Sequence, residues 1–209
     1  MKNNPFISAI VLAAGTSTRM GQKNKLFLRI DRKTILRWSV ENALKSTVNE
    51  VLVVTGEDIN QVLLELKQLD VNVLMNRNYL LGMSSSIITG IRAVNPNSDA
   101  ALILLADQPN LQADTIDQLI QTFLDSEKKI VVSRYDGIIG NPALFDRSLF
   151  PELKQIEGDV GARSVLKRHS DNIAVVDIPE EESLDVDTPQ DFEKIRSLLQ
   201  RAEFSTEIS

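Results

Sequence analysis

Cationic and small residues gather in one short stretch near the start of the chain, and their types suit phosphate chemistry. Gly15 and Gly21 lie in this stretch, together with Arg19, Lys23 and Lys25. Glycines in a loop let backbone N–H groups approach phosphate oxygens closely. Arginine and lysine side chains neutralise a triphosphate and the charge that builds up during phosphoryl transfer. The glycine spacing fits neither a Walker A loop nor the dinucleotide-binding G-x-G-x-x-G pattern.

Aspartates stand at two further places that suit this chemistry. Asp107 follows an apolar run, Ala100–Leu105, after one intervening alanine, and Asp187 precedes Thr188-Pro189. Mg²⁺ prefers oxygen ligands and is commonly held by one or two carboxylates together with substrate phosphates. A structural interpretation is also open for each aspartate, because Asp and Thr ahead of proline are a common helix start.

Short apolar runs alternate with segments of helical period along the chain, and these elements must position the residues above. The predicted strands are Ile7–Ala13, Glu50–Val54, Val71–Met75, Ala100–Leu105, Lys129–Ser133 and Ile173–Val176. The predicted helices begin after Thr34 and at Ile59, and cover Ser84–Ala93, Asp114–Asp125 and Pro189–Leu199. Alternation of this kind predicts a three-layer, doubly wound α/β fold, with helices on both faces of a mostly parallel sheet.

The ends of two of these strands are expected to build the site. In open α/β sheets, ligands bind beyond the carboxyl ends of the strands, at the point where the strand order reverses. If the first and fourth strands are neighbours, the loops after Ala13 and Leu105 meet there. Those loops carry the cationic stretch and Asp107.

Composition excludes several classes of function. The net charge of -6 argues against a surface for nucleic acid, and the absence of cysteine excludes thiol nucleophiles and Cys-based zinc sites. The lone His169 stands in a polar stretch and is expected on the surface. No apolar run is long enough to span a membrane, and the first residues do not resemble a signal peptide, so we expect a cytoplasmic protein. We expect a single domain over 1–201 and a flexible tail over 202–209.

The segment LAAGTSTRMGQKNK resembles the signature of the MobA-like nucleotidyltransferases, and within them that of the molybdenum cofactor cytidylyltransferases. Five further motifs of that family follow in order, so the resemblance covers nearly the whole chain. They are Asn76–Ile87, Leu105–Pro109, Gly140–Phe145, Gly158–Arg163 and Asp185–Pro189.

The resemblance implies a Rossmann-like nucleotidyltransferase fold and a role for each matched residue. It implies that Lys25 and Arg19 are catalytic and that Asp107 and Asp187 bind Mg²⁺, with Asp185 as the alternative ligand. Lys23 is a rival to Lys25, because three residues separate Gly21 from Lys25 where relatives often have two. The implied nucleotide-binding residues are Leu12, Ala13, Ala14, Gly15, Arg19, Lys25, Asn76, Gly82, Ser84, Ser85 and Asp107. The implied acceptor-binding residues are Gln108, Pro109, Asn141, Pro142, Asp159 and Arg163.

The resemblance also implies a reaction. CMP passes from CTP to the terminal phosphate of molybdenum-bearing molybdopterin, and a molybdenum hydroxylase receives the cytosine dinucleotide product. Ala14 supports CTP, since relatives that use GTP tend to carry glycine at that position. The alternatives are a guanylyl- or sugar-phosphate nucleotidyltransferase, and a non-catalytic protein that delivers cofactor to a hydroxylase. No nucleic acid or membrane partner is expected.

Overall fold

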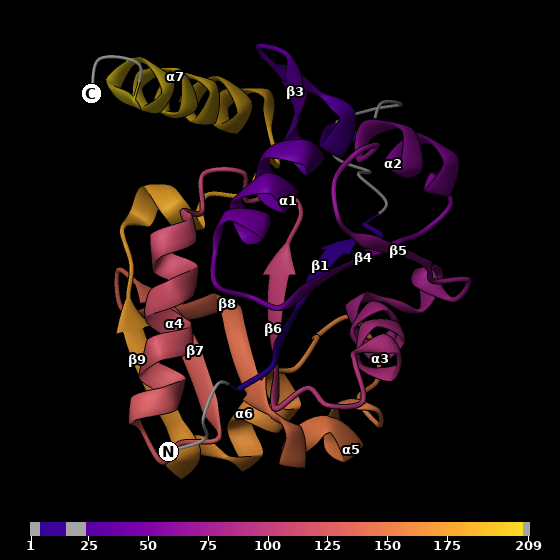
Figure 1. The fold of residues 1–209 in the computed structure, drawn as a ribbon, viewed down its shortest axis with the longest axis vertical. Helices are drawn as coiled ribbons and strands as arrows, with labels where there is room; N and C mark the ends of the chain where they lie inside the picture. The colour runs from indigo at the N-terminus through magenta and orange to yellow at the C-terminus, as the bar shows by residue number, and fades with distance from the viewer. Residues whose placement is uncertain (1–4, 16–23, 207–209) are drawn as a thin grey trace.

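The computed structural model describes residues 5–15 and 24–206 (Figure 1). Within this part of the chain, one central sheet contains β1 (Ile7–Ala13), β4 (Glu50–Thr55), β5 (Asn72–Met75), β6 (Ala100–Leu105), β7 (Ile130–Tyr135), β8 (Ile138–Asp146) and β9 (Ile173–Asp177). The strand order is β5-β4-β1-β6-β8-β7-β9, and β2 (Arg29–Ile30) pairs with β3 (Lys33–Thr34) in a separate hairpin. Only β8 runs antiparallel to its neighbours in the central sheet.

Helices cover both faces of the central sheet. One face packs against α1 (Ile35–Lys45), α2 (Ile59–Glu65), α4 (Ala113–Asp125) and α7 (Pro189–Thr206), and the other against α3 (Met83–Ala93), α5 (Phe150–Leu153) and α6 (Arg163–Arg168). Strand β1 is buried throughout because its side chains alternate between the two layers. Val11 packs into the first layer, and Ile10 and Leu12 pack into the second. The predicted three-layer, mostly parallel α/β fold is confirmed.

Strand β8 is the main difference from the predicted elements. The sequence predicts no strand there, although Asp136-Gly137, with positive φ at both residues, is the two-residue turn of a β7–β8 hairpin. Pro142 in the middle of β8 obscures the strand pattern in the sequence, since proline argues against a central strand. The strand tolerates Pro142 where the pairing with β7 is irregular, between Val132 and Ser133.

Helices α1 and α7 bear on two of the predictions made from the sequence. The predicted helix cap at Thr34 is confirmed, because its side-chain oxygen accepts a hydrogen bond from Arg37 N–H at 3.2 Å. The last helix, α7, lies beside β3 at one end of the molecule and continues to Thr206 (Figure 1). It therefore runs through the expected boundary at 201, and the single-domain division stays a prediction.

No helix among the described residues combines the length and apolar character needed to cross a membrane.

Helix α3 lies very close to strand β1, and Gly90 makes this possible. A Cβ atom at Gly90 would lie 2.5 Å from Ile10 Cγ2, well inside contact distance. Because Gly90 has no side chain, α3 can pack directly against β1, the strand that precedes the cationic stretch.

We expect Gly90→Ala to destabilise the protein by about 1–3 kcal/mol, because overpacking a close contact outweighs the better helix propensity of alanine. Urea unfolding of the purified variant measures this free energy. Arg92→Ala, on the exposed side of α3, is the control and should change stability by less than about 0.5 kcal/mol. Equal stability of Gly90→Ala and the parent would contradict the close packing.

Candidate active site

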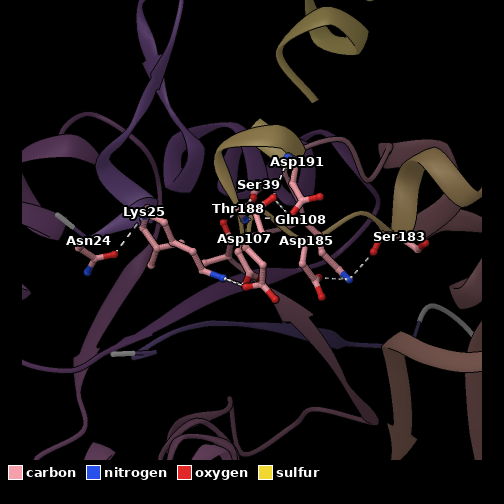
Figure 2. Close-up of polar contacts among 12 residues, drawn as sticks. Asn24, Lys25, Ser39, Asp107, Gln108, Ser183, Asp185, Thr188 and Asp191 are labelled. Atoms are coloured by element: carbon pink, nitrogen blue, oxygen red, sulfur yellow. Dashed lines mark hydrogen bonds and ion pairs between the residues drawn. The ribbon is translucent and has the colours of Figure 1, made fainter. Parts of the chain in front are cut away.

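The loops after β1 and β6 meet at one edge of the sheet, as the sequence predicts. The two strands pair in parallel with Leu12 opposite Leu105, and Ala106 N–H donates to the Leu12 carbonyl at 3.1 Å. Ser39 on α1 donates its hydroxyl hydrogen to the Ala106 carbonyl at 2.9 Å (Figure 2). The backbone that carries Asp107 is therefore held from both sides.

A distant part of the chain, residues 183–188, is tied to the end of β6. Val186 N–H donates to the Asp107 carbonyl at 3.0 Å. The side-chain amide of Gln108 donates to the Ser183 carbonyl at 3.2 Å and to Asp185 Oδ1 at 2.9 Å (Figure 2). These bonds place Asp187 beside Asp107, although their positions in the sequence are far apart.

Lys25 connects the two aspartates. It begins a short 3₁₀ helix (Lys25–Phe27) that Asn24 caps by accepting a hydrogen bond from Leu26 N–H, and the buried Leu26 anchors this turn in the core. The Lys25 ammonium lies 2.6 Å from Asp107 Oδ2 and 2.7 Å from Asp187 Oδ1. Figure 2 shows the Lys25 side chain extended toward Asp107. The three predicted residues thus form one cluster.

Burial and charge act against each other in this cluster. Burial alone would lower the pKa of Lys25, but the nearby carboxylates of Asp107 and Asp187 outweigh it, so the pKa of Lys25 is raised. Burial and the charge of Asp107 raise the pKa of Asp185 to about 6. Asp107 and Asp187 thus share the Lys25 ammonium, and the charge of Asp107 reaches Asp185 nearby, an arrangement that favours a further cation.

A pocket of about 520 Å³ opens beside this cluster. Six of the predicted nucleotide-binding residues line it: Leu12, Ala14, Gly15, Lys25, Gly82 and Asp107. Lys25 and Asp107 contribute charged groups to its lining, and Tyr79–Met83 together with Ser86, around the start of α3, contribute much of the rest. A pocket lined by both charged and apolar side chains suits a nucleotide, whose triphosphate is charged and whose base has apolar faces.

A smaller pocket of about 150 Å³ adjoins the first and shares Met83 and Asp159 with it. Of the predicted acceptor-binding residues, Asn141, Asp159 and Arg163 line this pocket. The peptide bond between Asn141 and Pro142 is cis. Two joined pockets can hold two substrates whose reacting groups meet at the shared wall.

Other predicted residues lie outside the lining of both pockets, and several of them form hydrogen bonds within the protein. Asn76 is buried and donates to the hydroxyls of Ser85 and Ser86. Ser84 is buried, with 1% of the residue exposed. Gln108 holds the 183–188 segment, as described above. Ala13, Pro109 and Pro142 also lie outside the lining, and Arg19 and Lys23 lie outside the described residues.

The nucleotide-binding residues implied by the resemblance do not include Tyr79 or Ser86, although both line the larger pocket. Both belong to the Asn76–Ile87 motif. Helical periodicity could have favoured Ser86 over Ser85, because Ser86 and Gly82 are four residues apart and lie on the same side of a helix.

Comparison with known proteins gives the family of the chain. Residues 9–173 match the MobA-like NTP transferase domain. The chain belongs to the MobA-like NTP transferase family. One relative is the purine catabolism protein PucB of Bacillus subtilis, 33% identical over 94% of this chain and 98% of that protein. Among solved structures, Rv0371c of Mycobacterium tuberculosis superimposes with a TM-score of 0.80 at 25% identity, over 92% of this chain and 98% of that one.

Two further relatives have names that describe quite different enzymes. The molybdenum cofactor cytidylyltransferase of Escherichia coli is 28% identical over 89% of this chain and 93% of its own length. The nicotine blue oxidoreductase of Paenarthrobacter nicotinovorans is 26% identical over 88% of this chain and 93% of its own length. Membership of this family shows that the chain is a nucleotidyltransferase.

Proposed function

We propose that this chain transfers CMP from CTP to the terminal phosphate of molybdenum-bearing molybdopterin in the cytoplasm and releases pyrophosphate. The observation that carries the proposal is the Lys25 ammonium between Asp107 and Asp187, in the lining of one pocket that adjoins a second. The similarity to the cytidylyltransferase of Escherichia coli supports the choice of substrates.

The residues present fit a Mg²⁺ ion. Two carboxylate oxygens, of Asp107 and Asp187, already converge on one positive atom, the Lys25 ammonium nitrogen. Mg²⁺ is commonly held by one or two carboxylates and takes its remaining ligands from phosphates and water. Asp107 and Asp187 would hold the ion, which when bound supplies charge stabilisation for the phosphoryl transfer.

The chain's own residues supply position and charge for the reaction. A terminal phosphate oxygen of the acceptor forms a bond to the α-phosphorus of CTP, and the bond to the pyrophosphate oxygen breaks. This phosphate oxygen is already anionic near neutral pH, so no general base is needed. Lys25 and Arg19 neutralise the charge on the transferred group, while the pockets hold the two substrates in line.

The lining of the smaller pocket supports its proposed role as the binding site of the acceptor. Asn141, Asp159 and Arg163 offer polar groups at its wall, and its interior is formed by apolar side chains such as Ile103 and Phe145. A ring system with polar edges suits this mixture. A molybdenum hydroxylase would then receive the cytosine dinucleotide. Simple delivery of a cofactor would require neither Lys25 nor the paired carboxylates.

We expect Lys25→Ala to lower kcat by on the order of 100-fold or more, because the variant loses a cation aimed at the developing charge. Steady-state assays of CMP transfer, with circular dichroism to check folding, measure the effect. Lys23→Ala is the matched control and should stay within about threefold of the parent. The reverse ranking would show that Lys23, in place of Lys25, meets the phosphates.

Competition between CTP and GTP tests which nucleotide base the enzyme uses. We expect the cytosine dinucleotide to dominate when both nucleotides, Mg²⁺ and molybdenum-bearing molybdopterin are present in one reaction. Ala14 lines the nucleotide pocket, and its methyl group narrows the space for a purine. One methyl group is worth about 1–3 kcal/mol of discrimination. Mass spectrometry of the products measures the ratio, and equal incorporation or an excess of the guanine product would contradict the proposal.

A further inference from the structure

Helix α2 contributes no residue to the lining of either pocket, yet it is bonded to the segment that carries Lys25. The short turn Lys25–Phe27 follows Asn24 directly, and Arg29 stands two residues beyond its end. The side chains of Asn24 and Arg29 both contact α2, one at the start of the helix and the other at its end. The Lys25 turn is therefore held against α2 on both sides.

The first contact lies at the start of α2. The Asn24 side-chain amide donates to Asp58 Oδ2 at 2.7 Å, and its Oδ1 accepts from Leu26 N–H at 3.1 Å. Figure 2 shows Asn24 beside Lys25. Asp58 occupies the N-cap position of α2, where an aspartate usually accepts a hydrogen bond from its own helix. Its side chain makes no such bond, and its carboxylate instead accepts the hydrogen of Asn24.

The second contact lies at Glu65, the last residue of α2. Arg29 Nη2 lies 2.7 Å from Glu65 Oε1 and 3.0 Å from Glu65 Oε2. The Glu65 side chain is only 12% exposed, so water and salt screen this ion pair less than a fully exposed one. Arg37 on α1 donates to the Glu65 carbonyl at 2.7 Å, and Val62 is buried in the core. These contacts make α2 a fixed support for the Lys25 turn.

We propose that α2 is a positioning element for the transfer reaction: Asp58 and Glu65 hold the chain on either side of the Lys25 turn and so direct the Lys25 ammonium at the phosphates of the nucleotide. Lysine carries its charge on a long, flexible side chain, so its aim depends on a fixed backbone. A cation stabilises developing charge best when it is already in place before the reaction. Asp58 and Glu65 lie outside the pocket lining and act through Lys25. The inference rests on the proposed role of Lys25.

A double-mutant cycle with Lys25→Ala tests the inference, with inorganic triphosphate and Mg²⁺ as the probe. Inorganic triphosphate represents the charged part of any nucleoside triphosphate, so the result depends on neither the base nor the acceptor. Titration calorimetry on the complete chain measures the affinity, and circular dichroism checks folding. We expect Lys25→Ala to weaken binding about tenfold and Asp58→Ala to weaken it about fivefold.

The cycle shows whether α2 acts through Lys25. In the Lys25→Ala background, Asp58→Ala should change the affinity by less than about twofold, because the ammonium that it positions is gone. We expect Glu65→Ala to show the same dependence on Lys25. A loss of general stability would instead weaken binding by the same factor with and without the lysine.

Two further variants sharpen the test. Asp58→Asn keeps a side-chain oxygen that can accept from Asn24, so it should recover most of the affinity that Asp58→Ala loses. Asp70→Ala is the matched control, since it removes an exposed aspartate beyond the other end of α2 and outside both pockets. It should leave the affinity within about twofold of the parent.

The outcomes separate this inference from the proposed function. If Asp58→Ala and Glu65→Ala leave binding unchanged, or weaken it equally in both backgrounds, the inference fails and the proposed function stands. If Lys25→Ala leaves triphosphate binding unchanged, the proposed role of Lys25 fails and the inference fails with it. If the cycle shows the expected coupling but no CMP reaches molybdopterin, the inference stands and the proposed acceptor is wrong.

Discussion

The site depends on one backbone hydrogen bond, which Val186 N–H donates to the Asp107 carbonyl at 3.0 Å. This bond fixes the 183–188 segment to the end of β6 and so sets Asp187 beside Asp107. The neighbouring carboxyl groups repel one another, and burial together with the charge of Asp107 raises the pKa of Asp185 to about 6. The packed sheet and the Lys25 ammonium stabilise this unfavourable grouping. The cost of the grouping is a reason to expect a cation there.

The layer architecture and the position of the site follow from local signals in the sequence. Strand β1 is apolar at nearly every position because it is buried on both faces, and Thr34 caps α1 as its residue type predicts. Parallel pairing of β1 with β6 then brings the cationic loop and Asp107 to one edge of the sheet. The resemblance to the MobA-like family also implies that Lys25, Asp107 and Asp187 share a site, and the structure brings these three side chains together.

Other features depend on tertiary contacts that no local pattern reveals. Pro142 hides the central strand β8, which is held by antiparallel pairing with β6 and β7. Three consecutive serines open α3, and residue type alone does not distinguish them. Their environments do, since Ser84 is buried away from the pockets and Ser86 lines the larger one. Which serine can meet a ligand is set by the direction of each side chain on the helix and by the bonds of Asn76.

The central claim is that Asp107 and Asp187 hold the metal of a metal–nucleotide complex and release Lys25 to the phosphates. A crystal structure with Mn²⁺ and a non-hydrolysable CTP analogue, using anomalous scattering to locate the metal, tests this most directly. The account predicts an anomalous peak between the two carboxylates and the Lys25 ammonium in contact with a phosphate oxygen. A peak elsewhere, or a Lys25 ammonium that still bridges Asp107 and Asp187 with nucleotide bound, would contradict it.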